Sequence, residues 1–340
     1  MSSERPVLVV LGATGNQGGS VVSYFLSKWP SIYAIRAITR DPSSAKSVAL
    51  AAQGAEVVAG NYDDPLSLNA AFRGASAIFS VTDYMPPFLD PSQREKAAVS
   101  GQNIGELCRD IEAQKTRNIF DAAAKVSTLE RLVLSTLPNA SKISGGKYAH
   151  VYQYDGKAIG AEYGRCTYPD LWAKTSVFYA GFYLENWLGA PGAILRPKLD
   201  TSKGKLVSNI SEPIASAPMP IYSALNDTGN LVHALLRAAP GVSLLGINEL
   251  LSFRDVATLI AEAQKQEIEY VESGPNFDLG DPDFNKQNEQ MLGFILEFGY
   301  DGSSIDKSVI QPNALDLPVE LETVGKWIAK QDWESVLEVV

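Results

Sequence analysis

The sequence predicts an α/β fold: a Rossmann-type, doubly wound parallel sheet followed by a smaller lobe of mixed α and β structure. Three observations support this prediction. Strand-like and helix-like segments alternate through the first half of the chain, glycines at three-residue spacing follow the first strand, and short segments punctuated by prolines replace the alternation after about residue 190. Alternating strands and helices are typical of a parallel sheet with helices on both faces.

The first strand and the turn after it predict a dinucleotide site near the N-terminus. Residues 7–11 are an apolar run, and the apolar residues of 18–29 recur with a helical period. A strand, a glycine turn and a helix place backbone N–H groups and the positive end of the helix against a pyrophosphate. The spacing is G-x-x-G-x-x-G, so the alternative is an ordinary strand-to-helix turn. The candidate contacts in the turn are Gly12, Thr14, Gly15, Asn16, Gln17 and Gly18.

The second strand, residues 33–39, favours one of the two nicotinamide cofactors. It is followed by Arg40, Asp41 and Pro42. In dinucleotide-binding folds an acidic residue about 20 positions after the glycine turn binds the ribose 2′-hydroxyl, whereas an arginine suits a 2′-phosphate. Arginine also forms forked hydrogen bonds to phosphate. Because a proline follows Asp41, we expect Asp41 to cap the next helix. The sequence therefore favours NADP(H), with a solvated charge as the alternative for Arg40.

The remaining elements of the first half follow in order. We predict strands at 55–59, 77–81 and 131–135, and helices at 43–53, at 66–72 and in a long segment that ends near Lys125. We expect residues 85–87 to form a loop and residues 92–125 to form one long helix or two. The segment around 86–112 is interpreted as an insertion. This segment is expected either to cover the substrate or to lie on the surface. Ligands should bind at the carboxyl ends of the strands, near 12, 40, 60–63, 82–84 and 135–137.

The second half is interpreted as a smaller lobe. We predict a helix at 231–239 capped by Asp227 or Thr228, a helix at 253–264 behind Ser252, a loop at 274–285, and a final helix at 318–337 that carries Trp327 and Trp333. The predicted division is therefore an NADP-binding domain at 1–190 and a smaller substrate or partner lobe at 191–340, intertwined with the first.

Charge and composition exclude several functions. The chain has 29 basic and 39 acidic residues and a net charge of −10. It therefore has no basic surplus for binding nucleic acid, although a protein partner with a basic face is compatible with this charge. No apolar run approaches the roughly 20 residues that cross a bilayer, and no apolar targeting core begins the chain, so we expect no membrane partner and a cytoplasmic location. Two histidines and no carboxylate cluster predict that there is no metal site. His233 is expected to be structural, and both Cys108 and Cys166 are expected to be core residues.

Five segments together resemble the NmrA-like family of atypical short-chain dehydrogenases. They are Gly-Ala-Thr-Gly-Asn-Gln-Gly (12–18), Thr-Arg-Asp-Pro (39–42), Gly-Ala-Glu-Val-Val-Ala-Gly-Asn-Tyr-Asp-Asp (54–64), Asp-Gly-Lys (155–157) and Phe-Tyr-Leu-Glu-Asn (182–186). The resemblance covers most of the chain, and the insertion departs from it. It implies a Rossmann domain that prefers NADP(H), with adenine contacts near Asp63. On the nicotinamide side, it and the strand ends together indicate Thr82, Tyr84, Ser135, Lys157, Tyr179 and Phe182.

The catalytic pattern of short-chain dehydrogenases is only partly present. These enzymes place a tyrosine four residues before a lysine; the lysine holds the nicotinamide ribose, and the phenol passes a proton to the carbonyl oxygen. Gln153 stands four residues before Lys157, but Tyr154 lies on the same helical face. We therefore predict Lys157 as the ribose anchor and Tyr154 as the candidate proton donor, with a packing role as the alternative for Tyr154. Further options near the site are Tyr148, His150 and Tyr152.

Two functions follow from these observations. The leading hypothesis is an NADP(H)-dependent oxidoreductase that reduces a carbonyl or an activated double bond of a small, fairly apolar molecule, with residues 178–187 walling the pocket. The alternative is a non-catalytic, NADP(H)-binding redox sensor that acts through a regulatory protein partner. The resemblance implies both possibilities, and the broken tyrosine–lysine pattern and the acidic charge favour the second. An isomerase or dehydratase that uses the cofactor structurally is a third class.

Overall fold

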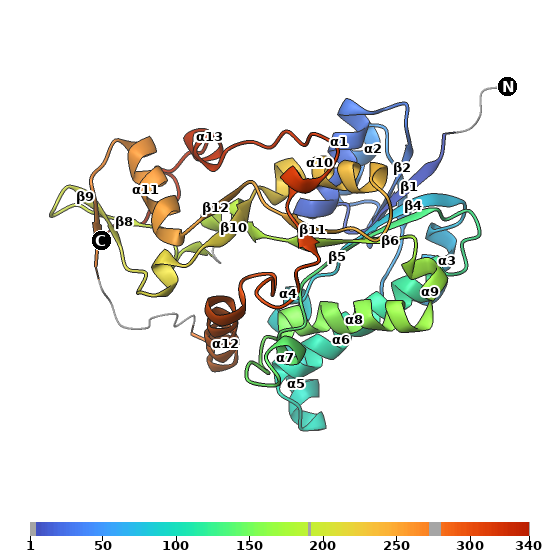
Figure 1. Ribbon diagram of the computed structural model, residues 1–340, viewed down its shortest axis with the longest axis horizontal. Coiled ribbons are helices and arrows are strands. Elements are labelled where there is room, and N and C mark those ends of the chain that lie inside the picture. The colour runs from blue at the N-terminus through green and yellow to red at the C-terminus, as the bar shows by residue number, and fades with distance from the viewer. Residues whose placement is uncertain (1–4, 190–191, 272–279, 340) are drawn as a thin grey trace.

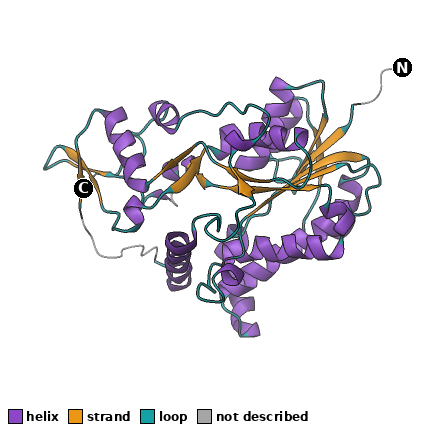
Figure 2. Ribbon diagram, in the orientation of Figure 1, coloured by secondary structure: helices purple, strands orange, loops and turns teal. Residues whose placement is uncertain are grey.

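The computed structural model describes residues 5–189, 192–271 and 280–339 (Figure 1). Its centre is an eight-stranded sheet in the order β14-β11-β6-β5-β4-β1-β2-β3, and every neighbouring pair is parallel. Helices cover both faces of this sheet (Figure 2). The predicted Rossmann-type fold class is confirmed. The strands are β1 (Val7–Val10), β2 (Ala34–Thr39), β3 (Glu56–Ala59), β4 (Ala75–Ser80), β5 (Arg131–Thr136), β6 (Thr175–Ala180), β11 (Ser243–Gly246) and β14 (Val309–Ile310).

Two helical layers sandwich the sheet (Figure 1). The helices α1 (Asn16–Lys28) and α10 (Ala224–Arg237) pack together on one face, and α3 (Pro65–Ala71), α6 (Ile104–Ala123) and α8 (Tyr152–Thr167) pack on the other. Apolar residues of the strands are buried beneath both layers, which is where most of the hydrophobic stabilisation arises. Shorter helices α2 (Ala45–Ala52), α7 (Ala140–Ile143) and α9 (Pro169–Trp172) complete this part.

The start of the insertion forms a helix rather than the predicted loop, and the helices expected after it are two. Residues 85–87, predicted to be a loop, begin α4 (Met85–Leu89), because prolines are tolerated in the first turn of a helix, where the backbone N–H has no helical partner. The following stretch is two helices, α5 (Pro91–Ser100) and α6. Gly101 ends α5 in the left-handed region at φ 70°, and Asn103 caps α6 together with Glu106.

The second half forms the smaller mixed lobe and also returns to the main sheet. Two three-stranded sheets, β12-β10-β7 and β13-β9-β8, pack with helices around a core that contains Trp187, Phe253 and Trp327. The chain then contributes α10, β11 and β14 to the central layers. Its elements are β7 (Phe182–Tyr183), η1 (Leu184–Leu188), β8 (Lys198–Asp200), β9 (Lys205–Ser208), η3 (Ile214–Ser216), β10 (Met219–Tyr222), β12 (Glu249–Leu251), α11 (Phe253–Gln264), β13 (Ile268–Tyr270), α12 (Pro282–Phe298), η4 (Pro312–Ala314) and α13 (Val324–Ala329).

Several helix boundaries differ from the predictions in this half. The helix at 253–264 and its Ser252 cap are confirmed. The helix predicted at 231–239 begins at Ala224, because Ser223, rather than Asp227 or Thr228, caps it. In the loop predicted at 274–285, residues 274–279 lie outside the described residues, and 282–285 are helical because Asp281 caps α12 and Pro282 occupies its first turn.

Four further side chains test the predictions for buried residues. The final helix is only α13, and Trp333 lies beyond it, buried, with its indole N–H donating to the Ile328 carbonyl at 2.8 Å. Cys108 is buried as expected, whereas Cys166 is exposed near the end of α8. His233 is buried on α10 beside Trp29, as expected for a structural residue.

Among the described helices none combines the length and the apolar character needed to cross a membrane.

Candidate functional site

The glycine turn after β1 is shaped for a ligand that approaches the backbone. Gly12 has φ +63°, and a Cβ there would come within 2.8 Å of Val81. A Cβ at Gly18 would lie 2.3 Å from the Gly12 carbonyl oxygen. Gly15 caps α1 without any side-chain hydrogen bond, which leaves the first N–H groups of the helix for another acceptor. This cradle fits a pyrophosphate.

A pocket of about 660 Å³ opens at the carboxyl ends of the central strands, next to this turn. Fourteen of the fifteen predicted site residues line it. They are Gly12, Thr14, Gly15, Asn16, Gln17, Gly18, Arg40, Asp63, Thr82, Tyr84, Ser135, Tyr154, Lys157 and Phe182. The exception is Tyr179, which lines a separate pocket with Arg165 and Trp172. Successive side chains of a strand point to opposite faces, so a residue of β6 can lie close in sequence and still miss the site.

Arg40, which follows β2 and is expected to bind the 2′-phosphate, has its guanidinium group available for a ligand. Arg40 is exposed and makes no ion pair with any described residue. The neighbouring Asp41 forms no ion pair with it; its carboxylate instead accepts hydrogen bonds from Ser43 N (2.8 Å) and Ser43 Oγ (2.6 Å). These bonds hold the pKa of Asp41 below its usual value. The cap of α2 is Ser44, which corrects the capping role predicted for Asp41.

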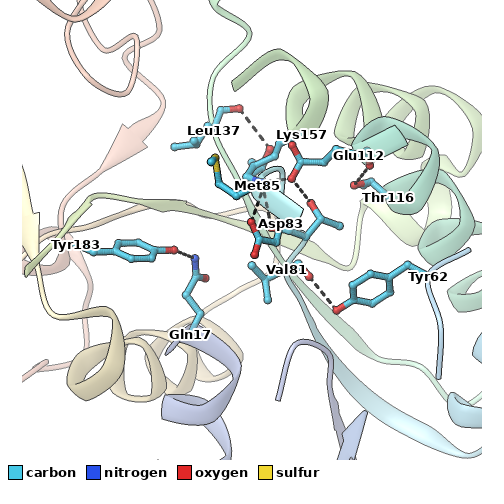
Figure 3. A network of polar contacts seen from close by, with 12 residues as sticks. Gln17, Tyr62, Val81, Asp83, Met85, Glu112, Thr116, Leu137, Lys157 and Tyr183 are labelled. Atoms are coloured by element: carbon cyan, nitrogen blue, oxygen red, sulfur yellow. Dashed lines mark hydrogen bonds and ion pairs between the residues drawn. The ribbon is translucent and has the colours of Figure 1, made fainter. Parts of the chain in front are cut away.

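Lys157 lies in a network that the sequence analysis did not find (Figure 3). Its ammonium group donates to the Thr82 carbonyl at 3.1 Å and forms an ion pair with Oε1 of Glu112. The same Oε1 accepts a hydrogen bond from the Thr82 hydroxyl at 2.9 Å. The Glu112 side chain is fully buried, whereas that of Lys157 keeps 15% exposure toward the pocket. Glu112 therefore contacts two of the predicted site residues, Thr82 and Lys157, although the sequence analysis did not name it.

A seam of glycines brings Glu112 to Lys157. Gly156, Gly160 and Gly164 recur at four-residue spacing on α8 and face Glu112, Thr116 and Phe120 of α6. A Cβ at Gly160 would lie 2.3 Å from Thr116 Cβ, so α8 has no side chain at these positions and the side chains of α6 pack directly against its backbone. The repeat of glycines at every fourth position is the sequence signal that could have indicated this close approach.

Tyr154 lines the pocket but is held in an apolar cluster. Its side chain is 2% exposed, and its ring packs edge-on against Phe294 and Tyr300 at centroid distances of 6.1 and 5.9 Å. Burial raises the pKa of Tyr154 well above its usual value. This environment favours the packing role over proton donation.

The other aromatic options near Lys157 are occupied elsewhere. The hydroxyl of Tyr148 donates to Glu297 at 2.9 Å, and that of Tyr152 pairs with Nδ1 of His150 at 2.6 Å. None of these three residues is among those that line the pocket. The proton-donor role is therefore not taken over by any of them.

Two polar contacts join distant parts of the chain across the pocket. The Gln17 side-chain amide on α1 donates to the hydroxyl of Tyr183 on β7, and burial raises the pKa of Tyr183 to about 12. The side-chain oxygen of Gln17, Oε1, is buried without a hydrogen-bond partner among the described residues. The Tyr84 hydroxyl donates to Gln287 on α12 at 2.7 Å, so this residue ties the insertion to the second half.

Another part of the pocket is lined by two separate helices, mainly with apolar side chains, although Asn288 of α12 also lines it. Met85 and Pro86 come from α4, and Phe284 and Met291 come from α12. Only the beginning of the insertion reaches this part, whereas α5 extends away from the sheet (Figure 1). The residues described contain no cluster of histidine, cysteine and carboxylate side chains that could hold a metal ion.

Comparisons with known proteins agree with this arrangement. A sequence model described as the NmrA-like family matches residues 4–328. The NmrA-like family domain-containing oxidoreductase ptmS of Penicillium ochrochloron is 25% identical over 97% of this chain and 99% of its own length. The corresponding oxidoreductase cpsB of Aspergillus campestris is 26% identical over 96% of this chain and 97% of its own.

Solved structures share the fold at low identity. The structure of NmrA, a negative transcriptional regulator, has a TM-score of 0.71 at 16% identity and covers 98% of this chain and 97% of its own. A triphenylmethane reductase of Citrobacter sp. has a TM-score of 0.63 at 19% identity, covering 96% of this chain and 98% of its own. NmrA has been solved with NADP and with NAD, and the reductase with NADP(H).

Proposed function

This chain belongs to the NmrA-like family, and we propose that it is an NADP(H)-dependent oxidoreductase that reduces a carbonyl or an activated double bond of a small, fairly apolar molecule. Support for oxidoreductase activity comes from the names of the curated relatives. Support for a nicotinamide dinucleotide comes from the complexes of NmrA and the Citrobacter reductase. At this level of similarity the chemistry has to be argued from the residues of this chain.

One observation carries the proposal: a single pocket joins a dinucleotide cradle to an apolar chamber. At one end lie the glycine turn and Arg40, and at the other lie Met85, Phe284 and Met291. Lys157 lies between them, where the strands β4 and β5 end. A volume of about 660 Å³ is within the usual range for ligand pockets. A sensor needs the cradle, but only an enzyme needs a chamber continuous with it.

Each residue then has a defined task. The N–H groups of the turn hold the pyrophosphate, Arg40 binds the 2′-phosphate, and Asp63 lies on the adenine side. Lys157 donates to the nicotinamide ribose, with further contacts on that side from Thr82, Ser135 and Phe182. When bound, NADPH supplies the hydride. Because Tyr154 is buried, we propose that a water molecule, rather than this phenol, delivers the proton.

The test combines binding with turnover. Calorimetry with NADPH and NADH on the purified chain should give binding of NADPH that is tighter than that of NADH. A panel of quinones, enones and ketones should then contain compounds that oxidise NADPH far above the background rate. No heat with either nucleotide would refute the cofactor assignment, and tight binding with no turnover of any compound would refute the reductase.

The second candidate is the non-catalytic sensor, which acts through a regulatory protein partner. Two observations favour it: the similar fold of NmrA, a negative transcriptional regulator, and the absence of a tyrosine four residues before Lys157. In that case, Lys157→Ala should weaken only nucleotide binding, and no acceptor should be reduced by the wild-type chain. Turnover that is lost in this variant at saturating NADPH would exclude the sensor.

A further inference from the structure

We propose that Glu112 is a positioning residue of this site: from the buried face of α6 it fixes the ammonium group of Lys157 so that one N–H remains directed at the nicotinamide ribose of bound NADP(H). The inference rests on the proposed function, because it assigns the purpose of a contact within the same pocket. Glu112 itself does not line the pocket and so acts through Lys157.

The hydrogen bonds of the ammonium group define its orientation. An ammonium group has three N–H donors. In Lys157 one goes to the Thr82 carbonyl and one to Glu112 Oε1. The third donor has no acceptor among the described residues, and because Lys157 lines the pocket, this donor is left for a ligand bound there (Figure 3). The Thr82 hydroxyl fixes Glu112 in turn by donating to the same Oε1.

The charged groups around Glu112 and Lys157 have other contacts or no ionic partner, and Lys157 is the one that pairs with Glu112 among the described residues. A fully buried carboxylate is costly unless it is paired. Arg109, one turn earlier on α6, pairs with Asp110 at 2.8 Å. Asp155, beside Lys157 on α8, accepts a hydrogen bond from Ser141 N at 3.1 Å. The remaining charged side chains that line the central part of the pocket, Asp83 and Lys115, form no ion pair with a described residue.

The glycines of α8 and the residues that face them on α6 allow Glu112 to come close to Lys157. A Cβ at Gly156 would lie 3.1 Å from Glu112 Oε2 and 3.0 Å from the Arg109 carbonyl oxygen. A Cβ at position 156, next to Lys157, would therefore require the Glu112 carboxylate or the Arg109 backbone to shift by a few tenths of an ångström. The other Glu112 oxygen, Oε2, has no hydrogen-bond partner among the residues described, so Glu112 makes its polar contacts only through the oxygen that faces Lys157 and Thr82.

The experiment separates positioning from simple stabilisation by using two ligands. NADPH spans the whole cradle, whereas adenosine 2′,5′-bisphosphate fills only the adenosine end and never reaches Lys157. Calorimetry would compare the wild type with Glu112→Gln and Glu112→Asp. The matched control is Glu162→Gln, which removes a half-exposed carboxylate from the other helix of the seam, where its ionic partner is the exposed Arg165.

The expected result is a selective loss. Glu112→Gln should weaken NADPH binding by at least about tenfold, the scale of a hydrogen bond to a charged group, while binding of the bisphosphate changes less than about twofold. Glu112→Asp keeps the charge but withdraws the carboxylate by one methylene, so it should show the same selectivity to a smaller degree. If Glu112→Gln does not fold, Glu112→Asp carries the test. The control should bind both ligands like the wild type.

Two results would overturn the inference. Equal weakening of both ligands would show a general structural role, and unchanged NADPH binding in both variants would show that the pair does not orient Lys157. Failure of the proposed function is distinguishable, because it appears in the wild type as an absence of NADPH binding.

Discussion

At the scale of single residues, cofactor choice depends on which charge is left free after β2. Arg40 and Asp41 are adjacent, and either could dominate the ribose site. In the structure, the Asp41 carboxylate accepts hydrogen bonds from Ser43, whereas Arg40 has no ionic partner among the described residues, which supports the proposed preference for NADP(H). The proline after Asp41 could suggest that this carboxylate bonds within its own turn, but its particular partner, Ser43, follows from the geometry of that turn.

Arg40→Ala should therefore change cofactor preference. We expect the affinity for NADPH to fall by about 10- to 100-fold, the value of a charge-assisted contact with phosphate, and the affinity for NADH to change little. Calorimetry with both nucleotides measures the effect. Arg165→Ala, which removes an exposed arginine paired with Glu162, is the control and should bind like the wild type. Equal losses for NADPH and NADH in Arg40→Ala would contradict the assignment.

Tyr154→Phe tests the source of the proton. Because the Tyr154 hydroxyl is buried among Phe294 and Tyr300, we expect kcat for the best acceptor found to stay within about threefold of the wild type. A general acid normally contributes about 100-fold or more. A loss of kcat on that scale, with NADPH affinity unchanged, would identify Tyr154 as the proton donor after all.

Asp227 should make stability depend on pH. It is buried on α10 and accepts a hydrogen bond from Asn248 at 2.7 Å, and burial raises its pKa from 3.8 to about 6. The folded state therefore holds this proton more tightly than the unfolded state. The resulting stabilisation is complete below the unfolded pKa and is lost as pH rises through about 6.

Asp227→Asn removes this titration. Between about pH 4 and pH 7 the unfolding free energy of the variant, relative to the wild type, should rise by about 2–3 kcal/mol, the value of a shift of roughly two pKa units. Urea unfolding at both pH values measures the difference. A relative stability that stays constant, or falls with pH, would show that the pKa of Asp227 in the folded chain is not raised above its unfolded value.

At the scale of elements, local patterns predicted the strands of the first half and the Ser252 cap, and tertiary contacts set boundaries that were missed. The start of α10 is an example: its first N–H groups, at Ala224 and Leu225, donate to the Glu185 carboxylate at 3.0 and 2.9 Å. Glu185 also accepts from the Ser223 hydroxyl at 2.7 Å. A partner that lies far away in the sequence cannot be read from a helical period, so the capping residue was placed too late.

The α6–α8 seam is the element-scale feature on which the site depends most. Gly160→Ala should destabilise the fold by about 1–3 kcal/mol, because the added methyl group meets Thr116 at 2.3 Å and the two helices must separate. Thermal or urea unfolding measures this. Gly325→Ala on α13 is the matched control, since its Cβ would meet only Leu259, at 3.7 Å. The control should be neutral or slightly stabilising; a neutral Gly160→Ala would show that the seam can relax.

At the scale of the whole molecule, the two ends of the pocket differ in how far the sequence predicts them. The cofactor end is made of consecutive elements, so the glycine turn and Arg40 could be recognised from their spacing along the chain. The chamber requires α4 and α12, which lie far apart in sequence and meet through pairs such as Tyr84 with Gln287 and Phe88 with Phe284. Glu112 was missed for the same reason, because its role exists only once α6 lies against α8.

Because different elements build the two ends of the pocket, we expect α12 to affect the binding of the substrate and not that of the cofactor. Phe284 lines the apolar end and packs against Phe88 of α4 at a centroid distance of 5.4 Å. Phe284→Ala should raise the KM of an apolar acceptor by about fivefold or more, because the lost contact area is worth on the order of 1–2 kcal/mol, and leave the Kd of NADPH unchanged. Leu296→Ala, an exposed residue of the same helix, should alter neither value. Steady-state kinetics and calorimetry measure the two constants separately. If Phe284→Ala weakened NADPH binding as much as it raised KM, α12 would have to reach the cofactor end, and the pocket could not be divided between the two halves of the chain.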